Sequence, residues 1–431
     1  MILGSNIVGL LILLLVIILF LTNWIPSAVA AVIGCLLFVA TGICSASEIF
    51  APMADSTVIL VVGMLIVGEA MFNTGVAYDA GNFILRITHH DERRIIFFTG
   101  LISALLSSFL SNVSVIAMAI SIINSITSVS TKIKKIQLYL PIIMGASFGG
   151  ILTLVGSTPQ ITALGILQKM NGGTLHVFDF TPGGIVLVAI YLAYVTIVGP
   201  KLGEKIWGDR DTEYDVAEDI KKIKQDAIVP SYSKRKKIIM LLIFIMMIIL
   251  FATEKFSVAF TSVLGAILCV VFGLTNENSA LKSVDWRIII RLGGCLGIAK
   301  GLQISGFGEL ISHAFIALFG NQIPAIVFLG ASVLLVMIVS NFITNSTAVV
   351  IVLPPTLAIC SSLHFNPVAF TLAIAYGANL CFCTPLASAQ MALALAGGYR
   401  FSDYFKYNII LEILTYIAII TVVSILYPLT N

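Results

Sequence analysis

The sequence predicts an all-α protein that crosses a membrane many times. Three observations lead to this fold class. The 431 residues are 59% hydrophobic and 10% charged, whereas soluble domains average roughly 25% charged residues. Apolar runs close to the roughly 20 residues that a spanning helix needs recur along the whole chain. These runs fall into two similar sets on either side of one polar stretch, residues 201–237.

Eight uninterrupted apolar runs each predict one spanning helix. They cover residues 6–23, 26–43, 57–75, 183–199, 236–252, 257–274, 285–302 and 408–427. The first has no basic start and a second run follows almost at once, so we expect a mature helix and not a signal peptide. Four further runs are interrupted by Gly, Pro, Ser, Thr or Asn, and they cover residues 95–129, 136–170, 322–362 and 367–397.

The two sets of runs repeat one order of elements. Residues 1–200 and 238–431 each contain three spans, a short amphipathic helix (78–88 and 307–319), two interrupted runs and a final span. A shift of 231 residues aligns small residues of the two halves, namely Gly63, Gly68 and Gly75 with Gly294, Ala299 and Gly306. Weak internal symmetry of this kind marks transporters built from repeats.

The positions of Lys and Arg predict how the chain crosses the membrane. If runs 95–129 and 322–362 are re-entrant hairpins, each half crosses five times and the second half is inverted. Of the 24 basic residues, only Lys169, Lys255 and Lys300 then lie on the opposite side of the membrane from the others. If these runs instead crossed the membrane fully, the lysines of 132–135 and the arginines of 86–94 would lie on opposite sides of the membrane. That arrangement would contradict the positive-inside rule. We expect a cytoplasmic linker at 201–237 and both termini outside, in a cell (plasma or inner) membrane.

The interrupted runs carry polar residues at matching places. The first such run of each half is broken near its middle, at SSFLSNVSV (107–115) and SNFITNSTA (340–348). The second is broken at Thr-Pro, in GGILTLVGSTPQ (149–160) and ANLCFCTPLASAQ (378–390). Backbone without helical hydrogen bonds is tolerated at membrane depth only where protein or a wet cavity satisfies it. We therefore expect all four breaks to line one cavity.

The breaks indicate an anion site without basic side chains. Pro159 and Pro385 disfavour helix in the residue before them, so each is expected to separate two half-helices. A helix that begins at mid-membrane points free N–H groups and about half a positive charge at its ligand. Carbonyls at the opposite ends, with Ser, Thr and Asn oxygens, suit a small cation. Hydroxyls that only bond to their own helix, or only join neighbouring helices, would not be expected at matching positions in both halves.

The ionisable residues argue against proton coupling at the breaks and against a phosphate substrate. No histidine lies in an uninterrupted span or beside a break, and Glu412 is expected near a cytoplasmic end. No Lys or Arg adjoins the breaks in the sequence, which favours a carboxylate. Glu69 and Lys300, related by the 231-residue shift, are expected to reach toward opposite membrane faces.

Several classes of function are excluded by composition and spacing. The net charge of +3 is too small to indicate a nucleic-acid partner. The seven cysteines lie in or beside apolar runs without zinc-like spacing, so we expect packing and no metal cofactor of that kind. A channel would not need broken helices from both halves, and an intramembrane enzyme would need a nucleophile and base, or a metal, near the breaks.

At these motifs the sequence resembles the divalent-anion/sodium symporter family of the ion transporter superfamily, which carries di- and tricarboxylates or sulfate. Nearly the whole chain takes part, and the motifs are two hairpin tips, SNV (111–113) and TNS (344–346), each followed by a Thr-Pro break. The resemblance implies a homodimer in which a scaffold stays still while a transport domain moves as an elevator, with helices 78–88 and 307–319 as connecting arms. It implies sodium-coupled transport of a dicarboxylate such as succinate or malate. The alternatives are cation-independent exchange, or citrate, sulfate or another anion.

The resemblance also implies site residues. Substrate carboxylates would meet Asn112, Ser114, Thr158, Asn345, Ser346, Thr347, Thr384 and Pro385. One sodium site would use Ser107, Ser111, Asn112 and the Gly156 carbonyl. A second would use Ser340, Asn345 and the backbone oxygens of Ile343 and Cys383. The chain departs from the family at Val113, where the motif has Thr, and at STPQ and TPLA, which replace Thr-Pro-Pro-Asn; a change in selectivity is expected there.

Overall fold

The computed structural model describes residues 4–22, 24–76, 92–112, 115–116, 119–120, 123, 135–207, 233–320, 323–386, 388–395 and 398–430. Helices form nearly all the regular structure of these residues, and an isolated bridge pairs Phe365 with Thr430. The predicted all-α fold class is thus confirmed. The predicted arm 78–88, most of the predicted linker, and Val113 and Ser114 lie outside the described residues.

Seven helical segments of the described chain are long and apolar enough to cross a membrane. They are Ser5–Thr22, Ala46–Asn73, Thr181–Trp207, Lys234–Thr253, Trp286–Ser305, Asn345–Leu363 and Phe401–Leu426. Six of them coincide with predicted spans, and the predicted spans 26–43 and 257–274 form shorter helices, Ser27–Ala40 and Val258–Val271. The chain is therefore a multi-pass membrane protein, while the sides on which its termini lie stay a prediction.

One group of helices comes from the first three predicted spans of each half, together with the predicted amphipathic helix 307–319. It contains α1 (Ser5–Thr22), α2 (Ser27–Ala40), α3 (Ala46–Phe50), η1 (Ala51–Ala54), α4 (Ser56–Asn73), α13 (Lys234–Thr253), α14 (Val258–Val271), α15 (Glu277–Ser283), α16 (Trp286–Ser305) and α17 (Phe307–Phe319). Helix α4 packs on α14, and α2 packs on α16. A Cβ added at Gly63 would lie 2.6 Å from the Ser262 backbone, so glycine allows α4 and α14 to approach closely.

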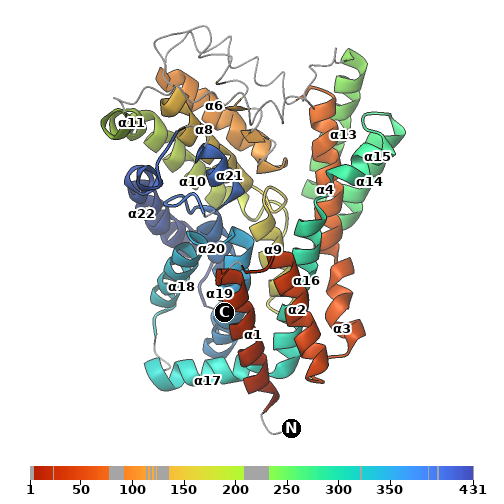
Figure 1. The fold of residues 1–431 in the computed structure, drawn as a ribbon, viewed down its shortest axis with the longest axis vertical. Coiled ribbons are helices and arrows are strands. Elements are labelled where there is room, and N and C mark those ends of the chain that lie inside the picture. The colour runs from red at the N-terminus through yellow and green to blue at the C-terminus, as the bar shows by residue number, and fades with distance from the viewer. Residues whose placement is uncertain are drawn as a thin grey trace.

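The second group contains the interrupted runs and the last span of each half. It comprises α6 (Glu92–Ser107), α8 (Lys135–Gly150), α9 (Thr158–Lys169), α10 (Thr181–Ala193), η2 (Tyr194–Val198), α11 (Gly199–Trp207), α18 (Ala325–Ser340), α19 (Asn345–Leu363), α20 (Pro367–Asn379), α21 (Ala389–Ala394) and α22 (Phe401–Leu426). In Figure 1 most of these helices lie to the left of α4, α13 and α14. The two groups meet where α9 packs on α16 and α4, and where α19 packs on α17.

The run 322–362 folds as a helical hairpin. Helix α18 ends at Ser340 and α19 begins at Asn345. The ring of Phe328, at the start of α18, lies 6.0 Å from that of Phe365, just beyond α19. The two arms are therefore antiparallel, with their open ends together. In the run 95–129 the first arm is α6 and most of the second arm lies outside the described residues. Whether either hairpin is re-entrant stays a prediction.

Both runs with a Thr-Pro motif are broken, but in different ways. Helix α8 ends at Gly150 and α9 begins at Thr158, with Pro159 in its first turn. Helix α20 ends at Asn379 and the six-residue α21 begins only at Ala389, beyond Pro385. Each proline thus separates two helices, as predicted. The expectation that a half-helix starts at the second Thr-Pro is wrong, because the described residues 380–386 and Ser388 are not helical.

Candidate functional site

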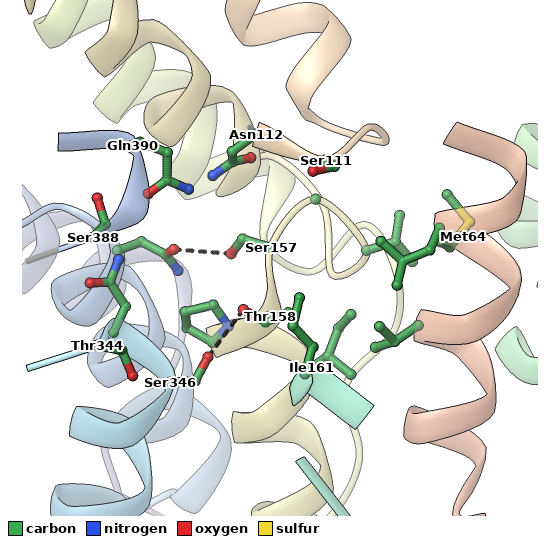
Figure 2. A pocket seen from close by; sticks show the side chains of 18 of the residues that line it. Met64, Ser111, Asn112, Ser157, Thr158, Ile161, Thr344, Ser346, Ser388 and Gln390 are labelled. Atoms are coloured by element: carbon green, nitrogen blue, oxygen red, sulfur yellow. Dashed lines mark hydrogen bonds between the residues drawn. The ribbon is translucent and has the colours of Figure 1, made fainter. Parts of the chain in front are cut away.

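A cavity of about 250 Å³ lies between the two groups of helices. One wall is formed by residues of α4 and α16, among them Met64 and Arg291. The rest comes from the breaks, and Figure 2 shows Asn112, Ser157 and Ser346 around it. Its volume is below the roughly 300–1,000 Å³ of pockets for drug-sized ligands. The cavity therefore suits a small metabolite, and the breaks of both halves do meet as predicted.

Two helix N-termini reach this cavity. Helix α9 begins with Thr158, helix α19 begins with Asn345 and Ser346, and all three residues line the cavity. Neither N-cap residue, Ser157 or Thr344, forms a side-chain cap hydrogen bond. Uncapped N–H groups and the positive ends of two helix dipoles favour an anion. The two termini are joined directly, since the Ser346 hydroxyl donates to Thr158 Oγ1 over 3.0 Å (Figure 2).

Each hairpin tip contains the same kind of internal hydrogen bond, from a serine to an asparagine. In the first half the Ser107 hydroxyl donates to Asn112 Oδ1 over 2.5 Å. In the second half the Ser340 hydroxyl donates to Asn345 Oδ1 over 3.1 Å. The bond spans five residues in both cases and holds the asparagine back across the turn. The tips therefore have the same local geometry although their sequences differ.

Each tip is also tied to the break of its own half. The Thr153 hydroxyl donates to the Ser108 carbonyl, and the Thr384 hydroxyl donates to the Asn341 carbonyl. Each threonine thus donates to a backbone carbonyl at the turn of a hairpin and holds the broken run against that turn. These matching bonds are what a duplicated architecture would produce.

Oxygen atoms converge near the first tip. A Cβ added at Gly150 would lie 3.0 Å from Asn112 Oδ1 and 3.3 Å from the Gly156 carbonyl oxygen. A Cβ at Gly156 would lie 2.9 Å from the Ser108 carbonyl oxygen. Glycine at both positions therefore lets several oxygens approach this part of the first tip, and oxygens are the ligands that a small hard cation prefers.

A neutral network links the two broken runs. The Ser157 hydroxyl donates to Asn379 Oδ1 over 3.0 Å and also contacts Gln160 Oε1. The Gln160 amide donates to the carbonyl oxygens of Gly150 (2.9 Å) and Thr153 (3.3 Å). Gln160 is fully buried and Asn379 nearly so. The non-helical backbone of the first break thus has partners inside the protein, as it must within a membrane.

The second break is held by α22. The Phe382 N–H donates to Glu412 Oε1 (3.1 Å), and the Asn408 amide donates to the Phe382 carbonyl (2.8 Å). Glu412 Oε1 also accepts from the Asn341 amide at 2.7 Å, and its other oxygen contacts the Cys383 thiol. Glu412, expected near a cytoplasmic end of its span, instead lies in mid-helix and is buried against the second break.

The predicted site residues divide into three sets. Those that line the cavity are Ser111, Asn112, Gly156, Thr158, Asn345 and Ser346. Those that are not among its lining residues are Ser107, Ser340, Ile343, Thr347, Cys383, Thr384 and Pro385, while Ser114 lies outside the described residues. Cys383 contributes its N–H to Asn341 Oδ1 at 3.0 Å. Their roles toward substrate and sodium stay predictions.

Sequence reasoning missed several residues of the site. The cavity is also lined by Ser157, Asn379, Ser388, Gln390 and Arg291. The first four lie within the Thr-Pro runs 149–160 and 378–390, and their polar side chains in those runs are the signal that could have found them. Glu412 was recognisable as part of a polar stripe at helical spacing in an apolar span, Tyr404, Asn408, Glu412 and Thr415. The expectation of an anion site without basic side chains is wrong, because Arg291 of α16, distant in sequence from every break, lines the cavity.

Comparison with known families identifies the chain. The model of the citrate transporter family (CitMHS) matches residues 17–341 and 248–430. The chain belongs to this family. This is a family of transporters, and the resemblance to the divalent-anion/sodium symporters is confirmed.

The relatives are themselves transporters. The uncharacterized transporter sll0640 of Synechocystis is 24% identical over 43% of this chain and 30% of its own length, so the chain spans less than a third of that relative. The sodium-dependent dicarboxylate transporter SdcS of Staphylococcus saprophyticus is 22% identical over 88% of this chain and 77% of its own. Among solved structures, the YdaH transporter of Alcanivorax borkumensis has a similar fold, with a TM-score of 0.63 at 12% identity and 89% of each chain covered.

Proposed function

We propose that this family member carries small divalent organic anions, C4-dicarboxylates such as succinate or malate, together with sodium. One observation carries the proposal: two uncapped helix N-termini, at Thr158 and Asn345, line one small cavity and are joined by the Ser346–Thr158 hydrogen bond. Such termini attract carboxylates without a basic clamp. The similarity to SdcS, named as a sodium-dependent dicarboxylate transporter, supports the same substrate class.

Sodium coupling is proposed from the oxygen donors at the tips. Asn112 Oδ1 and the Gly156 carbonyl oxygen lie near one point next to Gly150. The second half repeats the Ser-to-Asn bond of the first, from Ser340 to Asn345. Neutral side-chain and carbonyl oxygens at broken helices suit a monovalent cation. A cation there also offsets the charge of the neighbouring carboxylate.

The proposed mechanism is an elevator in a homodimer with inverted repeats. Two groups of helices support it, one built from uninterrupted spans and one containing the hairpin and the broken helices, with the cavity at their junction. In this proposal the group with the breaks moves relative to the other and carries the anion across the plasma membrane. Both termini then lie outside the cell.

Uptake into proteoliposomes tests the function. Labelled succinate is offered with an inward sodium gradient, without sodium, and without sodium but with internal succinate. Symport predicts uptake only under the sodium gradient, whereas exchange predicts uptake driven by internal succinate. Failure under all three conditions contradicts the dicarboxylate proposal.

A matched pair of serine variants links this uptake to the cavity. Ser346→Ala removes the hydroxyl that joins the two helix N-termini and is expected to lower uptake. Ser332→Ala is the control, because this buried hydroxyl bonds only to the Phe328 carbonyl of its own helix. Equal effects of the two changes would count against the site.

Citrate is the second candidate. The matching family model is described as a citrate transporter, and Arg291 adds a positive charge to the cavity wall. A third carboxylate could use that charge. Competition of unlabelled citrate with labelled succinate separates the two: citrate as the stronger competitor would make the tricarboxylate the substrate.

A further inference from the structure

Arg291 is the only charged residue among the described residues that line the cavity. It lies in the second turn of α16, within a segment long and apolar enough to span the membrane. Its side chain is partly buried. Ionisable residues inside a membrane span are costly, and they usually face a partner or a functional cavity.

This arginine has no ion-pair partner within the described part of the chain. Its nearest polar partner is Ser27 Oγ, 3.5 Å from Nη1, which is beyond the usual hydrogen-bond range. Arg287, one turn earlier on the same helix, differs completely. It is exposed, and two of its nitrogens bond to the Asp285 carboxylate over 3.0 and 2.9 Å. Arg291 is thus more buried than Arg287 and, among the described residues, lacks the ion pair that Arg287 has.

The other polar groups of the cavity are neutral and come from a different group of helices. Asn112, Thr158, Asn345 and Ser346 belong to the tips and breaks. Helix α16, in contrast, packs on α2, η1 and α1. The positive charge and the neutral ligands therefore converge on one cavity from two bodies that meet there.

We propose that Arg291 determines specificity for charge: it makes the cavity prefer anions with two or more negative charges over otherwise similar monoanions. The inference rests on the proposed transport of carboxylates through this cavity. The helix N-termini and amides then bind one carboxylate, and Arg291 attracts the second. If the helices with the breaks move as proposed, the anion meets this charge in only one end state, which favours the loaded form of that state.

Binding of succinate and of its monomethyl ester to purified protein tests this inference. The two ligands share a carbon skeleton and differ by one negative charge. Arg291→Gln is expected to weaken succinate binding by roughly 10- to 100-fold, the range for a hydrogen bond to a charged group. Binding of the ester should change much less, so that the preference for the dianion is largely lost. Arg291→Lys keeps a charge and should retain the preference.

Arg287→Gln is the matched control, because it makes the same change one turn away on an exposed, paired arginine. It should leave both ligands unaffected. The thermal unfolding temperature without ligand provides a second readout. Arg291→Gln should unfold at or above the wild-type temperature, because an unpaired charge in a membrane span costs stability.

Three outcomes overturn the inference. Unchanged succinate binding in Arg291→Gln shows that the charge does not act on the anion, while the proposed function stands. Equal weakening of both ligands, or a lower unfolding temperature, shows that the arginine is structural. Absence of binding of either ligand to the wild-type protein contradicts the proposed function itself, and the inference falls with it.

Discussion

The non-helical backbone at the two Thr-Pro breaks finds its hydrogen-bond partners in different kinds of side chain. In both, a run of backbone leaves the helix within an apolar chain, and its N–H and carbonyl groups need partners. The first break is satisfied by neutral groups: Gln160 reaches the Gly150 and Thr153 carbonyls, and the Thr181 hydroxyl donates to the Leu152 carbonyl over 2.7 Å. The second is satisfied from α22, by Asn408 and the Glu412 carboxyl.

The difference teaches which features the architecture requires. The Ser-to-Asn bond at the tip and the threonine that ties each break to its tip occur in both halves. The outer partners of the break do not match. The two tips therefore have the same hydrogen bonds, whereas the side chains that hold the two breaks differ. Among the described residues, an acidic side chain supports the second break and neutral side chains support the first.

The largest effect is expected from filling a glycine beside the first break. A Cβ at Gly149 would lie 2.1 Å from the Ala104 carbonyl oxygen, whereas one at Gly377, beside the second break, would meet only side chains at 3.0 Å or more. Gly149→Ala should destabilise the protein by about 3 kcal/mol or more and Gly377→Ala by about 1 kcal/mol or less. Yield and thermal unfolding of the two purified variants measure this, and similar values would contradict the asymmetry.

The second largest effect is expected at Glu412. Glu412→Ala leaves the Phe382 N–H without its acceptor and takes one of two acceptors from the Asn341 amide, which should cost about 2 to 4 kcal/mol. Substrate binding should fall as well, because the second break loses its support. Unfolding temperature and succinate binding are the measurements. Glu309→Gln, an exposed acidic position on α17, is the control. A fully stable and active Glu412→Ala protein would show that α22 does not hold the break.

The tips themselves are compared by Asn112→Ala and Asn345→Ala. If the anion contacts both tips, each change should weaken succinate binding by roughly 10- to 100-fold while the protein stays folded. Asn366→Ala is the control, because that side chain caps α20 through the Val368 N–H and does not line the cavity. A loss at one tip alone would assign the substrate to that half, and wild-type affinity in both variants would remove the site.

The smallest effect is expected at Gln160. Gln160→Leu removes the donor to two carbonyls of the first break and one acceptor of the Asn379 amide, which keeps its bond to the Ala375 carbonyl. The expected cost is therefore about 1 to 2 kcal/mol. Gln168→Leu, two turns later on the exposed side of α9, is the matched control. Thermal unfolding of both variants is the measurement. A cost equal to that of Glu412→Ala would mean that the charge of Glu412 adds nothing to its role.

The sequence by itself determined the features that depend on local pattern. Apolar length predicted the spanning helices, and the clusters around Asn112 and Asn345 predicted where helices break, because few residues satisfy an interrupted backbone in a membrane. Pro159 predicted a helix start at Thr158, since proline fits the first turn of a helix. Pro385 gave no such start: Glu412 and Asn408 of α22 hold the backbone of Phe382, three residues before it, and the next helix begins only at Ala389.

Only the tertiary structure decided which side chains meet. Arg291 and Glu412 lie on spans that have no break. The polar stripe of α22 singles out Glu412, but nothing near either residue in the sequence says which break or cavity it meets. Packing of α16 against α9 brings one to the cavity wall, and packing of α22 against α20 brings the other behind the second break. Local pattern fixes where a helix begins or ends, but the partners of a charge depend on contacts between residues far apart in the chain.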